Sequence, residues 1–157
     1  MAKRTAFLLI GIPASGKSTY AEKLTKESKN NLRVISTDNA RKVLYGDENI
    51  LGKWPDIQAF IEEELEYAYL HAEDVVIDAT HYRRKDRKGM IRTLLKYGFD
   101  NIQGVFLDSD LETALNRNRS RERVVPEDVI EKMHKTLAET PPEFEEGFSK
   151  LTIVVDN

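Results

Sequence analysis

The sequence contains no cysteine, one tryptophan and five prolines, and it has no hydrophobic run of the length that crosses a membrane. Without cysteine there can be no disulfide bond, no thiolate nucleophile and no cysteine-based metal site. The apolar stretch 6–10 follows Lys3 and Arg4 but ends after about five residues, which is too short for a signal peptide. These absences lead us to expect a cytoplasmic protein that does not associate with membranes.

The composition is that of a globular chain. Of the 157 residues, 40% are hydrophobic and 32% are charged, and no repeat, linker or low-complexity tract divides them. We therefore expect a single domain over residues 1–157. The net charge of −3 argues against extensive coating of nucleic acid, although it leaves room for a local basic groove.

Short apolar runs alternate with longer stretches of helical periodicity. The runs expected as strands are Thr5–Ile10, Leu32–Ser36, Val75–Asp78, Ile102–Leu107 and Leu151–Val155. The expected helices are Lys17–Ser28, Asn39–Tyr45, Asp56–Ala72, Arg83–Tyr97, Leu111–Arg117 and Pro126–Glu139. This alternation predicts an α/β fold, a three-layer sandwich in which helices cover both faces of a five-stranded parallel sheet.

Residues 11–19 read GIPASGKST and match the phosphate-binding pattern GxxxxGK[ST] between an expected strand and an expected helix. Glycine permits close approach of the backbone, and the loop amides point at phosphates. Lys17 is expected to reach the β- and γ-phosphates of ATP or another nucleoside triphosphate, and the Ser18 hydroxyl to bind Mg²⁺. The residues expected to contact the nucleotide here are Gly11, Pro13, Ala14, Ser15, Gly16, Lys17, Ser18 and Thr19.

A magnesium site of this kind needs an acid at the end of another buried strand. Asp78 ends the run VVID and can hold the ion or one of its waters. The alternative is an aspartate that caps the following turn. The phosphate loop favours the metal role, because it requires such a partner.

An acceptor site is suggested at the end of the second strand, where STDNAR places Asp38 and Arg41 one helical turn apart. The carboxyl ends of parallel strands meet at one edge, so Asp38 should lie beside the phosphate loop. A carboxylate there can accept the proton of a hydroxyl group, and an arginine can hold a nearby anion. The alternative is an N-cap aspartate followed by an exposed arginine.

Four arginines alternate over residues 117–123, directly before Val124-Val125-Pro126. Such a charge run is usually a solvated face. Between two helices at the active-site edge, however, guanidinium groups can stabilise a transferring phosphoryl group and exclude water. We therefore predict an arginine-rich lid near residues 117–125, and spacing alone does not say which arginine acts.

In order, the segments GIPASGKST, STDNAR, VVIDATH and RNRSRERVVPEDVIEKM resemble the P-loop polynucleotide 5′-hydroxyl kinases, relatives of zeta-toxin-like, tRNA-seryl and small-metabolite kinases. The resemblance implies a P-loop kinase fold in which Asp38 is the general base and Arg41 contacts acceptor phosphate. It assigns Arg117 and Arg121 to the donor phosphates, a task that Arg123 could share. One departure is His81, which follows Thr80 where the family often has asparagine, so acceptor specificity could differ.

Three functions stay open. The first is an ATP-dependent kinase of 5′-hydroxyl polynucleotide ends, the second a kinase of a small metabolite or nucleotide sugar, and the third an ATPase or switch without an acceptor. The basic segment 81–88 could contact a polynucleotide, with Tyr82 or Trp54 stacking on a base. It is equally consistent with a charged outer helix face and with Trp54 packing before Pro55. The oligomeric state is not predicted.

Overall fold

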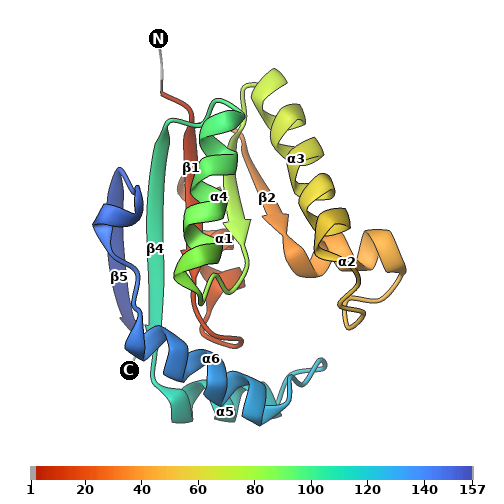
Figure 1. Cartoon of the computed structure of the whole chain (residues 1–157), viewed down its shortest axis with the longest axis vertical. Coiled ribbons are helices and arrows are strands. Elements are labelled where there is room, and N and C mark those ends of the chain that lie inside the picture. The colour runs from red at the N-terminus through yellow and green to blue at the C-terminus, as the bar shows by residue number, and fades with distance from the viewer. Residues whose placement is uncertain (1–2, 157) are drawn as a thin grey trace.

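Five parallel strands form the centre of the computed structural model, which describes residues 3–156 (Figure 1). They are β1 (Thr5–Ile10), β2 (Leu32–Ser36), β3 (Asp74–Asp78), β4 (Asn101–Ser109) and β5 (Lys150–Asp156), arranged in the order β2-β3-β1-β4-β5. All neighbouring pairs are parallel, so the strands end at one common edge. The predicted parallel sheet is confirmed, and β4 is longer than expected because its pairing with β5 extends to Ser109.

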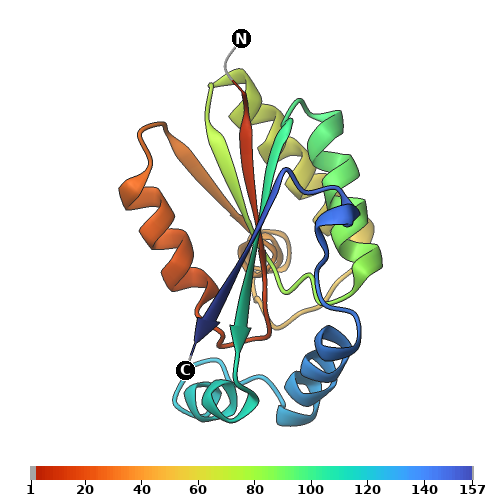
Figure 2. The same cartoon turned by 90° about the vertical axis from the view of Figure 1, so that its left-hand side faces the viewer.

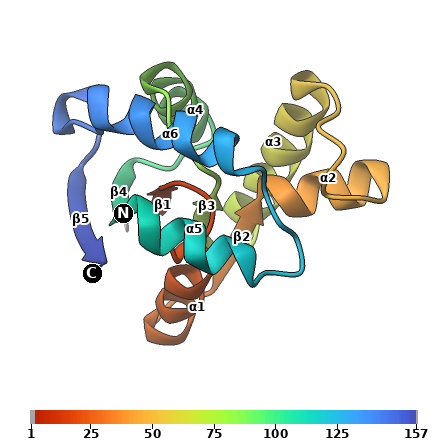
Figure 3. The same ribbon diagram turned by 90° about the horizontal axis from the view of Figure 1, so that it is seen from below.

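Six α-helices surround the sheet: α1 (Lys17–Glu27), α2 (Thr37–Tyr45), α3 (Trp54–Leu70), α4 (Arg84–Lys96), α5 (Leu111–Arg119) and α6 (Glu127–Glu139), with a short 3-10 helix η1 (Phe144–Glu146) before β5. Helix α1 covers one face of the sheet, and α3 and α4 cover the other (Figure 2). Helices α5 and α6 cross the carboxyl edge of the strands (Figure 3). Within residues 3–156, no helix combines the length and apolar character needed to cross a membrane.

The strands face two separate cores, as a sheet with helices on both sides requires. On β1, Leu8 and Ile10 point into the large core beneath α3 and α4, whereas Leu9 points into a smaller core beneath α1. All three side chains are fully buried. Burial of each such side chain stabilises the fold by roughly 1.5–3 kcal/mol. The apolar run of β1 therefore forms a central strand whose alternate side chains fill the cores on the two faces of the sheet.

A buried ion pair connects α4 to η1, the short helix that precedes β5. The Arg87 side chain is 0% exposed and donates to Glu146 from Nε at 2.6 Å and from Nη2 at 3.0 Å. Its remaining N–H groups donate to the carbonyl oxygens of His81 and Thr140. Breaking a pair of this kind typically costs about 3–5 kcal/mol. Arg87 is thus a structural residue and is removed from the basic segment 81–88 that could face a nucleic acid.

Helix α2 begins two residues before its predicted start. Ser36, the last residue of β2, has extended backbone angles, and its side chain accepts a hydrogen bond from the backbone N–H of Asn39. Serine is a favoured N-cap because it satisfies a backbone donor that has no partner within the helix. The helix therefore starts directly after the strand, and Asp38 lies in its first turn.

Candidate active site

The carboxyl edge of the sheet carries a cleft of about 2160 Å³. The phosphate loop, the first turn of α2, the loop after β3 and the α5–α6 turn all line it. Every site residue predicted from the sequence borders this cleft except Gly11, which lies behind the loop. Segments far apart in the sequence thus meet at one site, as the parallel topology requires.

The phosphate loop connects β1 to α1 with the conformation that its glycines allow. Gly16 is the N-cap of α1 and has a φ of 97°, which a side chain disfavours. At Gly11, an added Cβ would lie 2.5 Å from Ser15 Oγ, so the loop closes tightly only over glycine. The first N–H groups of α1 have no partner inside the helix and are suited to an anion.

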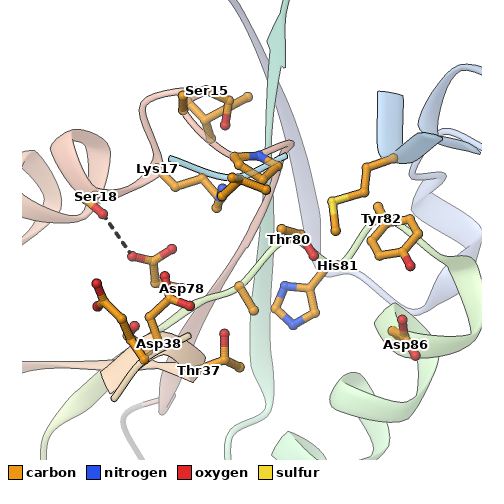
Figure 4. Close-up of a pocket in the computed structure, with 18 of the residues that line it drawn as sticks. Ser15, Lys17, Ser18, Thr37, Asp38, Asp78, Thr80, His81, Tyr82 and Asp86 are labelled. Atoms are coloured by element: carbon orange, nitrogen blue, oxygen red, sulfur yellow. Dashed lines mark hydrogen bonds between the residues drawn. The ribbon is translucent and has the colours of Figure 1, made fainter. Parts of the chain in front are cut away.

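Lys17 lies at the start of α1 and points back over the loop (Figure 4). Its Nζ donates to the carbonyl oxygens of Gly11 at 3.2 Å and Ile12 at 3.0 Å. Burial lowers the pKa of Lys17 to about 8, and the carboxylates of Asp78 and Asp38 offset only part of that effect. Hydrogen bonds to two neutral carbonyl groups leave the ammonium charge uncompensated, so it favours an anion nearby.

Ser18 and Asp78 come together on the same side of the cleft. The Ser18 hydroxyl donates to Asp78 Oδ2 at 3.3 Å (Figure 4). Burial raises the pKa of Asp78, although Lys17 and the hydroxyl of Ser18 counteract the shift. Within residues 3–156 no cluster of three or more His, Asp and Glu side chains could hold a metal alone. A hydroxyl and one partly buried carboxylate fit Mg²⁺, which uses few protein ligands and completes its shell with phosphates and water.

Asp38 faces the cleft between two arginines. Its Oδ1 lies 3.5 Å from Arg41 Nη1, and its Oδ2 accepts a hydrogen bond of 2.9 Å from Arg123 Nη1. Arg123 Nε also donates to Asn49 Oδ1 at 2.8 Å, in the loop between α2 and α3. In the structure, therefore, Arg123 lies on the Asp38 side of the cleft; its expected contact with donor phosphates stays a prediction. Asn49 carries no motif, and sequence reasoning missed it.

The α5–α6 turn is clamped at its base and reaches toward α2 (Figure 3). Asn118, which is fully buried, donates to the Val125 carbonyl at 2.7 Å and accepts from the Val125 N–H at 3.0 Å. Arg117, in the last turn of α5, and Arg121, in the turn itself, line the cleft. The buried atoms Arg121 Nη1 and Arg41 Nε have no hydrogen-bond partner within the described part of the chain. Buried guanidinium donors without partners suit an anionic ligand.

His81 lies in the loop after β3, between the two sides of the cleft (Figure 4). Its Nδ1–H donates to the Leu9 carbonyl at 2.7 Å, just before the phosphate loop. Burial lowers the pKa of His81 to about 4, so the ring is neutral at pH 7. A φ of 47° is uncommon for a residue other than glycine. His81 therefore joins the phosphate loop to the loop after Asp78.

Two aromatic residues were candidates for base stacking. Tyr82 is partly buried and packs against the large core while also lining the cleft. Trp54 is 52% exposed at the start of α3 and lines the same cleft. Its indole is accessible for stacking, and both its stacking on a base and its packing as a hinge before Pro55 stay predictions.

The strand order and the loop between β1 and α1 define a P-loop domain of the kinase type. A family model described as AAA domain matches residues 7–140. The chain therefore belongs to this AAA-domain family, and the sequence-based assignment to the P-loop kinases is confirmed.

Three known proteins place the domain among its relatives. It is 25% identical over 136 residues to L-seryl-tRNA(Sec) kinase of Methanococcus maripaludis, covering 82% of this chain and 50% of that protein. A chain of the Pnkp1/Rnl/Hen1 RNA repair complex superposes with a TM-score of 0.78 at 22% identity, over 89% of this chain and 46% of that one. A gluconokinase from Sinorhizobium meliloti gives 0.61 at 19% identity, over 99% and 84%. The chain thus spans about half the length of the first two relatives.

Proposed function

We propose that the domain transfers the γ-phosphate of ATP to a hydroxyl group, and that its acceptor is the 5′-hydroxyl end of a polynucleotide. The observation that carries the proposal is the position of Asp38. Its carboxylate lies in the same cleft as the phosphate loop and is flanked by Arg41 and Arg123. A carboxylate so placed can take the proton of an acceptor, which a nucleotide-binding switch does not need.

The charge of the cleft favours a polyanionic acceptor. The chain as a whole carries a net charge of −3, yet ten Lys and Arg side chains line the cleft against four Asp and Glu. A nucleoside triphosphate engages those near the phosphate loop and the lid. Others, such as Lys42, Lys85 and Arg92, lie along the remainder of the cleft. Positive charge beyond the donor site suits a phosphodiester chain better than a neutral sugar.

The proposed reaction is a direct, in-line transfer without an enzyme-bound intermediate. The acceptor oxygen bonds to the γ-phosphorus, and the bond from that phosphorus to the β,γ-bridging oxygen breaks, which releases ADP. Asp38 takes the hydroxyl proton. The loop amides and Lys17 hold the β- and γ-phosphates, while Arg117 and Arg121 from the lid stabilise the charge that develops. Arg41 binds phosphate of the acceptor.

Ser18 and Asp78 are the residues that would hold Mg²⁺, in agreement with their oxygen donors and their proximity in the cleft. When bound, the ion supplies neutralisation of charge on the donor phosphates. Ser18 would bind it directly through the hydroxyl, and Asp78 would bind it directly or through water.

A second candidate is a kinase of a small metabolite. A sugar-kinase fold, the gluconokinase from Sinorhizobium meliloti, covers nearly all of this chain. Likeness at 19% identity supports the fold and leaves the acceptor to other arguments. The third candidate, an ATPase or switch, would leave Asp38 and Arg41 without a role.

A transfer screen with γ-labelled ATP tests the proposal directly. Acceptors are 5′-hydroxyl DNA and RNA oligonucleotides, the same oligonucleotides carrying a 5′-phosphate, and a panel of sugars and other small alcohols. We expect label on the 5′-hydroxyl oligonucleotides alone. Label on a sugar with none on any oligonucleotide would reject the polynucleotide acceptor, and vigorous ATP hydrolysis without any acceptor would favour the ATPase.

A further inference from the structure

The cleft does not end at Asp38 but continues between α3 and α4. We define this α3–α4 groove by Trp54 and Gln58 on α3 and by Lys85, Gly89 and Arg92 on α4, all of which line the cleft. The members on each helix are spaced by three or four residues, so they share one face. Both helices begin at the carboxyl edge of the sheet (Figure 1). The groove therefore opens onto the site that holds the proposed base.

The groove has a closed end and an open wall. A hydrogen bond of 3.1 Å from Gln58 Nε2 to Thr93 Oγ1 joins α3 to α4 and closes the far end. The wall on α4 is formed by Gly89, where an added Cβ would meet only Arg92 Nη2, at 3.8 Å. Glycine weakens a helix interior, and no close neighbour requires one here. It does leave room for a ligand to approach the helix backbone.

Trp54, the single tryptophan, has an exposed indole, and the backbone on both sides of it is anchored. The hydroxyl of Tyr45 donates to Asp56 at 2.9 Å and accepts from the backbone N–H of Lys53 at 3.1 Å. The Tyr45 ring packs directly over Gly52, where no side chain would fit. These contacts fix the chain on both sides of Trp54. The anchored backbone places the accessible indole at the edge of the cleft, where a flat ring can stack on it.

The groove also carries positive charge without a partner. Lys85 and Arg92 are exposed, and within residues 3–156 no hydrogen bond or ion pair joins either one to another residue. Their neighbours differ: Arg83 pairs with Asp86 at 2.8 Å, and Arg84 pairs with Glu143 at 3.1 Å. Lys88 on α4 is exposed and likewise has no hydrogen-bond or ion-pair partner among residues 3–156, but it does not line the cleft, so Lys85 and Arg92 are the uncompensated cations of this segment that face the groove.

We propose that the α3–α4 groove binds the second nucleotide of the acceptor strand, with Trp54 stacked on its base and with Arg92 and Lys85 on its phosphodiester. The inference rests on the proposed function, because it extends a strand whose 5′-hydroxyl lies at Asp38. An aromatic platform beside cations is the chemistry that holds single-stranded nucleic acid. A small alcohol or a single nucleotide would leave this groove unused. The domain should therefore phosphorylate a dinucleotide with a higher kcat/KM than a mononucleotide.

The test compares acceptors of increasing length. Initial rates of transfer from ATP are measured with a 3′-phosphorylated nucleoside, a dinucleotide and a trinucleotide, each with a 5′-hydroxyl. For the wild type, kcat/KM rises at the dinucleotide. In Trp54→Ala the ratio of dinucleotide to mononucleotide kcat/KM falls about tenfold, within the range for loss of base stacking. In Arg92→Gln the dependence of oligonucleotide affinity on salt concentration weakens by about one phosphate contact.

Two control variants keep the same chemistry outside the groove. Phe144→Ala removes a ring that is 55% exposed on η1, and Lys88→Gln removes a charge from α4; neither residue lines the cleft. Both should keep the wild-type length ratio and salt dependence. The single tryptophan gives a binding signal without ATP: a dinucleotide should quench its fluorescence strongly and a mononucleotide weakly.

The outcomes separate the two proposals. If oligonucleotides are phosphorylated but Trp54→Ala retains the wild-type length ratio, the groove is not the second-nucleotide site and the proposed function stands. Equal quenching by mononucleotide and dinucleotide would overturn the inference in the same way. If no oligonucleotide is phosphorylated by the wild type, the polynucleotide acceptor is rejected together with the groove's occupant.

Discussion

The two halves of the cleft are built in different ways. The centre of the donor half is one continuous segment, Gly11–Ser18, whose backbone amides and helix N-terminus are suited to phosphate irrespective of most side chains. The acceptor half is assembled from α2, α3, α4 and Arg123 of the α5–α6 turn, and its contacts are made between side chains. A phosphate site made of backbone amides keeps its ligand as long as the loop folds. A site made of side chains can change its ligand by substitution, so we expect the acceptor half to be the part that determines specificity.

The largest effect is expected from a substitution that removes the proposed base of the acceptor half and leaves the donor half intact. Asp38→Asn removes the proposed base without touching the phosphate loop. We expect kcat for phosphoryl transfer to fall roughly 10²- to 10⁴-fold, as general-base catalysis is lost. The affinity for ATP, measured by calorimetry, should change less than twofold. Asp128→Asn, an exposed acid in the first turn of α6, is the matched control. Unchanged turnover in Asp38→Asn would refute the base role.

A second substitution tests whether Arg123 contributes to binding of the acceptor or of the donor phosphates. Its guanidinium holds Asp38 and Asn49, so Arg123→Gln should raise the KM for the acceptor about tenfold, the typical effect of losing a hydrogen bond to a charged group. The KM for ATP should stay within twofold. Arg119→Gln is the control, because Arg119 pairs with Glu127 and does not line the cleft. A rise in the KM for ATP alone would return Arg123 to the donor phosphates, as the sequence predicts.

The same comparison explains what could be predicted from the sequence. The strands and the phosphate loop are local patterns, so apolar runs and the GxxxxGK[ST] motif were sufficient for them. Asn49 reaches the cleft from the α2–α3 loop, where it meets Arg123, and Gln58 and Arg92 reach it where α3 lies beside α4, so no local pattern marks any of them. Arg87 looked like part of a basic surface, yet it is buried by Glu146, which lies 59 residues further along the chain. Motif spacing does not predict ion pairs between residues so far apart in the sequence.

His81 hydrogen-bonds to Leu9 at the end of β1, and replacing it should have a smaller effect, on the pH dependence of stability. Its pKa is lowered to about 4 in the folded protein, whereas the unfolded chain takes up the proton near pH 6.5. Stability therefore falls as the pH decreases from 6.5 toward 4, by about 2 kcal/mol at pH 5. His81→Asn should lack this part of the decrease, and asparagine tolerates the positive φ.

Urea denaturation at pH 8, 6.5 and 5 measures the difference. The exposed His71 provides the control, because His71→Asn should retain the wild-type loss of stability. If His81→Asn and the wild type lose equal stability between pH 6.5 and 5, the imidazole is not held neutral by burial. The link between the loop after Asp78 and Leu9 would then rest on the backbone alone.

The smallest effect is expected on the wall of the acceptor half, where stability and binding should move in opposite directions. In Gly89→Ala the added methyl group meets no atom closer than 3.8 Å, so alanine should stabilise α4 by about 0.5–1 kcal/mol in thermal or urea unfolding. The same methyl group narrows the α3–α4 groove, and the KM for a dinucleotide should rise a few-fold while the KM for ATP does not follow. Lys88→Ala, on the same helix but outside the cleft, should change neither constant. A Gly89→Ala protein that is more stable and binds the dinucleotide as well as the wild type would show that glycine at this position serves no ligand. A variant that weakens ATP and dinucleotide alike would show that the two halves of the cleft are not independent.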